Sequence, residues 1–449
     1  MTDHAFLSRH GLFQARAPRY TSYPTAPHFD RAVGPAQMEG WLASLPEGAG
    51  ISLYVHVPFC RRLCWFCACR TQGTKTDAPL RPWLDALRAE IDLMADAMPQ
   101  VRIDRLHLGG GTPTILPPEM LDEMAEALRA RFAFAPGAEI SVEIDPTVID
   151  DPRLDALARL GVTRASIGVQ DFAPKVQHAI GRTQSVAQTR EAVEGLRARG
   201  VSGLNLDLLY GLPFQDANSL GRTVDQALTL FPDRIALFGY AHVPWVARRQ
   251  VMIPADALPN AETRMALFAQ ASDRLTGAGF ASVGIDHFAR PADGLCVAQD
   301  EGRLRRNFQG YTDDDCETLI GLGPSAISRL PQGYAQNDPG TAKWQAAVRA
   351  RRPATLRGHA LSTRDRLEAV AIEELLCRFG AEAEVVAARA GADPAEARAL
   401  LAGVAADWPE AVRPTARGIR IVGRARPLAR LIAMSIDGYE RGDRHSLAV

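Results

Sequence analysis

Four of the seven cysteines lie within ten residues, at Cys60, Cys64, Cys67 and Cys69. Zinc sites usually combine a short Cys-x2-4-Cys step with a second Cys or His pair further along the chain, and no second pair is evident here. Three thiolates spaced C-x3-C-x2-C fit three corners of a [4Fe–4S] cube, and the fourth iron can then bind a ligand. A disulfide pair or a small structural zinc loop is the alternative interpretation.

The elements that must position these cysteines follow a repeated pattern. The cysteines come directly after an apolar run at 51–57 that predicts a short buried strand. Repeated β–α units predict a parallel sheet with right-handed crossovers, and six of them predict an α/β fold with a partial (β/α)6 barrel. The predicted strands are 51–57, 105–108, 139–143, 164–169, 203–208 and 234–240, and the predicted helices between them are 82–98, 118–132, 152–160, 186–199 and 217–231.

In such barrels the functional groups gather at the carboxyl ends of the strands. Polar or glycine residues stand at or just after the end of each predicted strand, so we expect them to face one shared cavity. They are Cys60, Gly109, Glu143, Gln170, Asp207 and Tyr240.

Three parts of the chain differ in pattern. Residues 1–49 contain several prolines and predict an extended arm that ends in a short helix near 36–45. Residues 50–350 hold the barrel, and 280–328 is predicted to line or cover its mouth. Residues 351–449 predict a small, mainly helical domain with helices at 364–379, 383–390 and 394–404 and a strand at 418–422.

Composition limits the partners. The formal net charge is −1 at pH 7, so no overall field favours nucleic acid or anionic lipid. No apolar run approaches the roughly 20 residues of a membrane span, and the N-terminus has no secretory pattern. We predict a cytoplasmic protein without a membrane or nucleic-acid partner. An iron–sulfur or zinc regulator that binds DNA through the C-terminal domain is a competing hypothesis, but it leaves the barrel unexplained.

The cysteine trio, with Phe66 directly before the third cysteine, resembles the signature of radical S-adenosylmethionine (SAM) enzymes. Cys69 extends it to C-x3-C-x2-C-x-C, which is similar to the oxygen-independent coproporphyrinogen III oxidase family. Further blocks of that family occur in the expected order. They are Arg19-Tyr-Thr-Ser-Tyr-Pro-Thr25, Gly109-Gly-Gly-Thr-Pro-Thr114, Val169-Gln-Asp-Phe172, Asp207-Leu-Leu-Tyr-Gly-Leu-Pro213, Asp286-His-Phe-Ala-Arg-Pro291 and Asn307-Phe-Gln-Gly-Tyr-Thr312.

The resemblance implies that Cys60, Cys64 and Cys67 bind the [4Fe–4S] cluster and that Cys69 does not. It also implies that SAM binds in the barrel, with two SAM molecules per chain. The glycines fit this role because they let the backbone approach a ligand closely. The positions that match SAM contacts in the family are Tyr54, Phe66, Gly110, Gly111, Thr112, Glu143, Gln170, Arg182, Asp207, Ala241 and Ile327.

By the same resemblance, the substrate is coproporphyrinogen III, and the enzyme needs an external reductant and an electron acceptor. We expect a monomer. Arginine binds carboxylates with two parallel hydrogen bonds, so Arg290 and Arg305 are candidate clamps for the substrate propionates. A haem chaperone of the same superfamily is an alternative. Such chaperones generally lack both the 19–25 block and the cysteine at position 69, and this chain has both.

Overall fold

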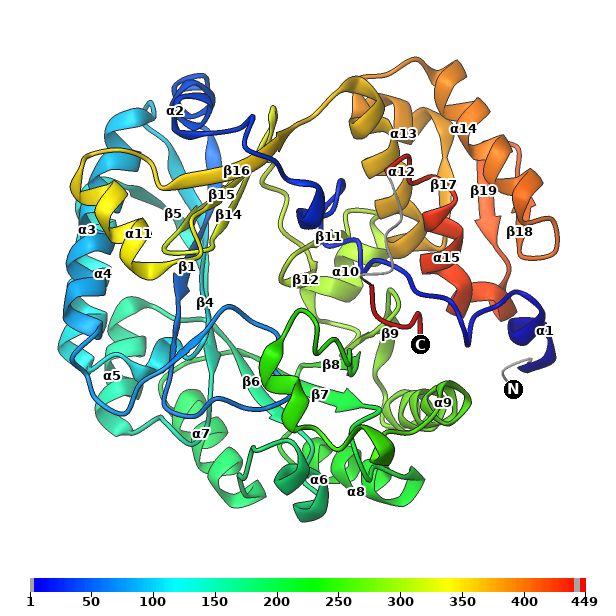
Figure 1. Cartoon of the computed structure of the whole chain (residues 1–449), viewed down its shortest axis with the longest axis horizontal. Coiled ribbons are helices and arrows are strands. Elements are labelled where there is room, and N and C mark those ends of the chain that lie inside the picture. Colours follow the sequence, from blue (N-terminus) through cyan, green and yellow to red (C-terminus); the bar gives the residue numbers. More distant parts are fainter. Residues whose placement is uncertain (1–3, 440–444) are drawn as a thin grey trace.

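A curved sheet of twelve strands forms the centre of the molecule in the computed structural model, which describes residues 4–439 and 445–449 (Figure 1). The strand order is β16-β15-β14-β13-β1-β4-β5-β6-β7-β8-β10-β9, and the run from β13 to β8 is parallel. Because β9 and β16 are opposite ends of this order, the barrel is partial, as predicted. The parallel strands are β1 (Gly50–Val57), β4 (Arg102–Gly110), β5 (Ala133–Ile144), β6 (Arg164–Gln170), β7 (Gly203–Tyr210), β8 (Arg234–Gly239) and β13 (Leu319–Leu322).

Amphipathic helices connect these strands and cover the outer face of the sheet (Figure 1). Capping residues mark the positions at which these helices begin. Ser185 and Gln188 form a capping box before one helix, and the Asp150 side chain accepts the Arg153 amide before another. These helices are α3 (Leu80–Ala97), α4 (Pro118–Arg131), α5 (Asp151–Leu160), α6 (Pro174–Ala179), α7 (Val186–Ala198), α8 (Ala217–Leu228) and α9 (Ala261–Gly277).

The predicted strand at 139–143 is too short, because β5 begins at Ala133. Its first residues pair Ala133 with Arg102 and Phe134 with Ile103, and the next partners are Glu139 and Arg105. The residues between bulge out of the ladder around Pro136 and Gly137, where an interrupted pattern hides the start of the strand.

Segment 280–328 does more than line the mouth, because parts of it extend the sheet at both edges. On one edge β10 pairs antiparallel with β8 and with β9, and on the other β13 leads into an antiparallel meander. Strands this short leave too little pattern to predict. The edge strands are β9 (Ala281–Val283), β10 (His287–Ala289), β14 (Ile327–Leu330), β15 (Gly333–Asn337) and β16 (Thr355–Ala360), with α10 (Gly294–Asp300) and α11 (Thr341–Arg349) beside them.

The C-terminal region forms a second core that includes the start of the chain. Phe6, Leu7, Leu12 and Phe13 of the arm are buried against C-terminal residues such as Leu375. The arm then crosses to the barrel, and on the way Arg16 forms a β-bridge with Leu447, so the arm runs beside the C-terminal segment (Figure 1). The elements here are α1 (His4–Arg9), α12 (Thr363–Arg378), α13 (Ala383–Ala390), α14 (Pro394–Asp407), α15 (Ala429–Met434), β17 (Gly380–Glu382), β18 (Val412–Pro414) and β19 (Gly418–Ile421). The arm's other helix, α2 (Pro35–Ala43), lies apart from them and packs on the barrel beside α3 (Figure 1).

Among residues 4–439 and 445–449, no helix combines the length and the apolar character that crossing a bilayer requires.

Candidate active site

A cavity of about 590 Å³ occupies the barrel and opens at the carboxyl ends of the parallel strands. It brings together every residue predicted to bind the cluster or SAM except Tyr54 and Ile327. The predicted residues that line it are Cys60, Cys64, Phe66, Cys67, Gly110, Gly111, Thr112, Glu143, Gln170, Arg182, Asp207 and Ala241.

Tyr54 lies just behind the wall of the cavity. Its ring stacks on His107, with ring centroids 5.7 Å apart, and meets the edge of Phe308 at 5.1 Å. His107 and Phe308 both line the cavity, so they separate Tyr54 from it. Ile327 lies on β14, beyond β13 at the sheet edge, and its backbone pairs with Gln336.

The cysteines sit in a loop that leaves β1 and is fixed at both ends. Strand β2 (Phe59–Cys60) pairs with β3 (Gln72–Gly73), and the Trp65 amide donates to the Ile180 carbonyl at 2.9 Å. All seven cysteines are free thiols. Within the described ranges, no three His, Cys, Asp or Glu side chains are arranged around a single metal ion.

Each sulfur of the predicted ligand trio has a polar neighbour. The Thr112 hydroxyl donates to Cys60 Sγ at 3.7 Å, although burial still raises the pKa of Cys60 to about 11. The pKa of Cys67 falls to about 6 because of its hydrogen bond with Cys69, and nearby Arg249 and Arg182 add to the shift. Cys69 therefore contacts the trio through Cys67, a role that its spacing did not reveal.

At the glycine turn that ends β4, any residue with a side chain would clash with its neighbours. A Cβ on Gly111 would lie 2.5 Å from the Phe59 carbonyl oxygen and 3.0 Å from Cys60 Sγ. Gly110 has φ +110, and a Cβ there would lie 2.6 Å from the His56 ring. Only glycine satisfies both constraints at this turn, because the backbone here passes close to Phe59 and to the His56 ring.

Glu143 faces the cavity from the end of β5 and has the partners that a buried carboxylate needs. The Gly110 amide donates to Glu143 Oε2 at 3.0 Å, and His107 Nε2 lies 3.3 Å from Oε1. Burial raises the pKa of Glu143, but His107 and the Gly110 amide outweigh it and hold the pKa below its ordinary value. The carboxylate is therefore ionised and available to a cationic ligand.

Asp207 lies deeper in the barrel on β7. It accepts hydrogen bonds from Ser166 Oγ at 3.0 Å and Asn205 Nδ2 at 2.8 Å. Burial and the charge of Glu143 raise the pKa of Asp207 to about 6. Gln170, at the end of β6, has φ +69, a conformation that costs a non-glycine residue energy and is common at functional sites.

Arg182 ties the cysteine loop to the barrel. Its guanidinium donates to the Gly168 carbonyl at 2.7 Å and to Cys64 Sγ at 3.4 Å, and it forms an ion pair with Asp145 at 3.3 Å. Because Arg182 is nearly fully buried, these contacts fix its position. The Arg182 side chain therefore forms the salt bridge with Asp145 and contacts Cys64 in the site at the same time.

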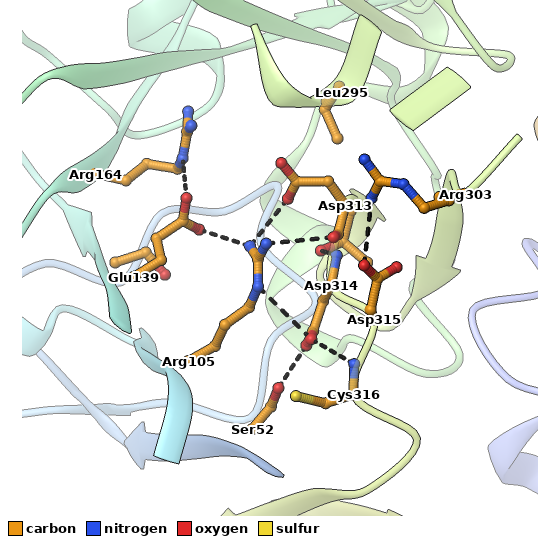
Figure 2. Close-up of polar contacts among 12 residues, drawn as sticks. Ser52, Arg105, Glu139, Arg164, Leu295, Arg303, Asp313, Asp314, Asp315 and Cys316 are labelled. Atoms are coloured by element: carbon orange, nitrogen blue, oxygen red, sulfur yellow. Dashed lines mark hydrogen bonds and ion pairs between the residues drawn. The ribbon is translucent and has the colours of Figure 1, made fainter. Parts of the chain in front are cut away.

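Six side chains of alternating charge form a ring of ion pairs at one end of the cavity, and Figure 2 shows the part of it that runs from Arg164 through Glu139 and Arg105 to Asp313. Arg105 joins Glu139 at 3.0 Å and Asp313 at 2.9 Å, and neighbouring pairs continue the ring at distances up to 3.7 Å. Three cations and three anions balance within this ring, so it adds no net charge to the cavity. Its members are Arg105, Glu139, Arg164, Asp293, Arg234 and Asp313.

Several lining residues were not predicted. His107, Ser166 and Asn205 occupy alternate strand positions that point inward, and this period of two was the signal that could have found them. Gln250 had no such signal. It lies in a short 3-10 helix (Arg248–Met252) after β8, yet its side-chain amide donates to the carbonyls of Phe66 at 2.7 Å and Ala241 at 3.0 Å.

Comparison with known proteins assigns a family to this site. The radical SAM superfamily model matches residues 54–227. An oxygen-independent coproporphyrinogen III oxidase of Paracoccus denitrificans (strain Pd 1222) is 54% identical, and the match covers 100% of both chains. The chain belongs to the oxygen-independent coproporphyrinogen III oxidase family.

Other members of this family agree in sequence and in fold. The oxygen-independent coproporphyrinogen III oxidase of Pseudomonas aeruginosa is 38% identical over 95% of this chain and 94% of its own length. The solved coproporphyrinogen III oxidase of Escherichia coli, described as a radical SAM enzyme, aligns with a TM-score of 0.89 and 36% identity. That alignment covers 94% of this chain and 98% of the solved one, so the predicted partial barrel is confirmed.

Membership in the radical SAM family implies a [4Fe–4S] cluster and SAM. The geometry fits both. Three thiols line one wall of the cavity, Arg182 and Thr112 donate to two of the sulfurs, and the missing side chain of Gly111 keeps the approach to Cys60 open.

Proposed function

We propose that this protein is an oxidoreductase that converts the ring A and ring B propionates of coproporphyrinogen III to vinyl groups. The product is protoporphyrinogen IX, and the reaction is a step of anaerobic haem synthesis. Relatives that match the whole chain carry the corresponding name. The observation that supports the proposal best is the single cavity that combines Cys60, Cys64 and Cys67 with the glycine turn and Glu143.

Cys60, Cys64 and Cys67 would hold the cluster. When bound, the cluster and SAM supply the one-electron chemistry that removes a hydrogen atom from the β-carbon of each propionate. Arg182 holds Cys64 in place, and Thr112 does the same for Cys60. Glu143, kept ionised by His107, offers its carboxylate to the ammonium group of SAM.

Each propionate loses one hydrogen atom, carbon dioxide and one electron. An external acceptor therefore takes an electron for every vinyl group formed, and an external reductant starts each cycle. The protein contributes by holding the ring system against the cofactors and by excluding water from the barrel. The charged ring helps with the second task because its paired side chains occupy one end of the cavity.

Several finer points belong to the same proposal. Two SAM molecules per chain are supported by the number of polar groups in the cavity beyond Glu143, including Gln170 and Asp207. Tyr54 would act through His107 and Phe308, and Ile327 through its backbone. We also infer a cytoplasmic monomer with three parts, 1–49, 50–350 and 351–449. The first and third share one core, which supports a joint role at the barrel mouth.

An anaerobic assay tests the proposal. Reconstituted protein is mixed with SAM, a reductant, an electron acceptor and coproporphyrinogen III, and protoporphyrinogen IX and 5′-deoxyadenosine are quantified. Both products are expected. SAM cleavage without any decarboxylated porphyrinogen would refute the substrate.

Substitution of one ligand tests the cluster separately. Cys64→Ala should abolish the visible absorption of the cluster and remove most of its iron. Cys296→Ala is the matched control, because Cys296 is a buried free thiol in α10, outside the cavity. Equal iron content in the two variants would contradict the ligand assignment.

A further inference from the structure

A second cavity of about 240 Å³ lies beside the first, between the arm, α9 and the C-terminal residues. The two cavities share Arg19, Gly239 and Arg306 in their walls. None of the residues predicted to hold the cluster or SAM lines this second space. We call it the arginine chamber, after the guanidinium groups in its wall: Arg19, Arg306, Arg426 and Arg430.

The chamber carries an excess of positive charge. Asp286 is the only acidic side chain among its described lining residues. That carboxylate already has two partners, since Asp286 Oδ1 lies 2.7 Å from His287 Nδ1 and 3.8 Å from Arg306 Nη1. Four guanidinium groups thus share this wall with one acidic side chain that is already engaged and with Val449, whose oxygen accepts from Arg264. Arg306 is buried, whereas Arg19 and Arg426 are exposed, so cationic side chains are in excess on a wall that an anionic ligand can reach.

Arg19 is the guanidinium most open to such a partner. Its Nη2 donates to the Gly239 carbonyl at 2.6 Å, and no carboxylate lies within 4 Å of it among the described residues. The Arg19 side chain is exposed and lines both cavities. Arg306 adds a second donor, because its buried Nη1 has no hydrogen-bond partner and only the Asp286 carboxylate lies near it, at 3.8 Å.

Arg430 has a different role in the same wall. It donates to the carbonyls of Ala17, Pro18 and Ala448, and so fixes the backbone immediately before Arg19. Burial lowers the pKa of Arg430 to about 9, and the charge of Arg19 adds to the effect. The two cations therefore repel each other, and a bound anion would relieve that repulsion.

We propose that Arg19, aided by Arg306, binds a carboxylate of the tetrapyrrole, and that the arginine chamber receives a propionate that the enzyme does not convert. The inference rests on the proposed function. A carboxylate bound there stays away from the cysteine loop, because the chamber and the cluster site lie in different cavities. Arg19 then fixes which ring edges turn toward the reaction.

Arg290 and Arg305, which were predicted from sequence as propionate clamps, are engaged in other contacts. Arg290 donates to the Ala278 carbonyl at 2.9 Å and lies 4.2 Å from the centre of the Phe280 ring. Arg305 forms an ion pair with Glu373 at 3.2 Å. Neither arginine is among the residues that line these two cavities, because their side chains are used in the contacts just described.

Binding titrations test the inference. Coproporphyrin III, the stable oxidised ring with four carboxylates, and its uncharged tetra-amide are titrated by fluorescence into the reconstituted protein. Arg19→Gln should weaken coproporphyrin III binding by about 10- to 100-fold, equivalent to about 1.4 to 2.7 kcal/mol, and leave the tetra-amide unchanged. Arg19→Lys should lose less, because it keeps the charge but not the planar fork.

Arg290→Gln is the control and should bind both probes as the wild type does. SAM cleavage without substrate should be the same in all variants, which reports an intact cofactor site. Unchanged coproporphyrin III binding by Arg19→Gln would overturn the inference, and so would an equal loss for the two probes. Failure of the proposed function is distinct: the wild type would then form no protoporphyrinogen IX, whatever the titrations show.

Discussion

Substituting Gly111 with alanine tests how tightly the cysteine loop is held. The new Cβ would lie 2.5 Å from the Phe59 carbonyl oxygen, 2.9 Å from its carbon and 3.0 Å from Cys60 Sγ. Non-bonded atoms prefer about 3.5 Å or more, so something must move by roughly 0.5 to 1 Å. The Phe59 backbone resists, because β2 is paired with β3. Overpacking of this kind costs about 1 to 3 kcal/mol, and the Cys60 sulfur that it would displace is a proposed cluster ligand.

The measurements are urea unfolding and the iron and sulfide content after reconstitution. Gly111→Ala should lose both stability and cluster. Gly403→Ala is the matched control, since a Cβ there meets nothing within 4 Å in the interior of α14. It should gain about 0.5 to 1 kcal/mol, because alanine favours a helix over glycine. Wild-type iron content and stability in Gly111→Ala would refute the idea of a rigid loop.

Two further predictions concern buried charges. Arg105→Met removes two ion pairs of the charged ring and should lower the free energy of unfolding in urea by about 2 to 3 kcal/mol. This is less than the loss expected for a fully buried pair, because Arg105 is partly exposed. An unchanged urea midpoint would contradict a stabilising ring. Glu90, bound to the Gly323 amide and Asn337, has its pKa raised by burial to about 7 from 4.5. Folding therefore binds a proton, and stability falls by about 3 kcal/mol as pH rises from 4.5 to 7. Glu90→Gln should flatten that dependence, and parallel pH profiles would exclude Glu90 as its source.

The central fold was predictable because its signal is local. The run at 51–57 and the alternation around Glu143 each identify a strand without help from the rest of the chain. The edge strands β9, β10 and β14 were missed because each spans three or four residues and is held by its neighbours. The bulge at 135–138 hid the start of β5 for a similar reason.

The site residues also fall into those with a local sequence signal and those placed by tertiary contacts. Cys60, Cys64 and Cys67 were predicted from their spacing, Glu143, Gln170 and Asp207 from their places at strand ends, and the other predicted lining residues from the family resemblance. Gln250 was out of reach, because its role depends on a loop folding back onto Phe66. The clamps at Arg290 and Arg305 were wrong for a related reason. Their chemistry suits a carboxylate, but the direction of a side chain is set by tertiary packing.

The pairing of β1 with two distant strands has a consequence for synthesis. Leu53 pairs with Leu106 on one side and with Ile320 on the other. The second partner leaves the ribosome long after the first, so the apolar edge of β1 stays open while most of the chain is made. Open strand edges favour aggregation, and contacts this distant in sequence form slowly. Nascent chains that end before 319–322 should therefore depend on chaperones until that strand arrives.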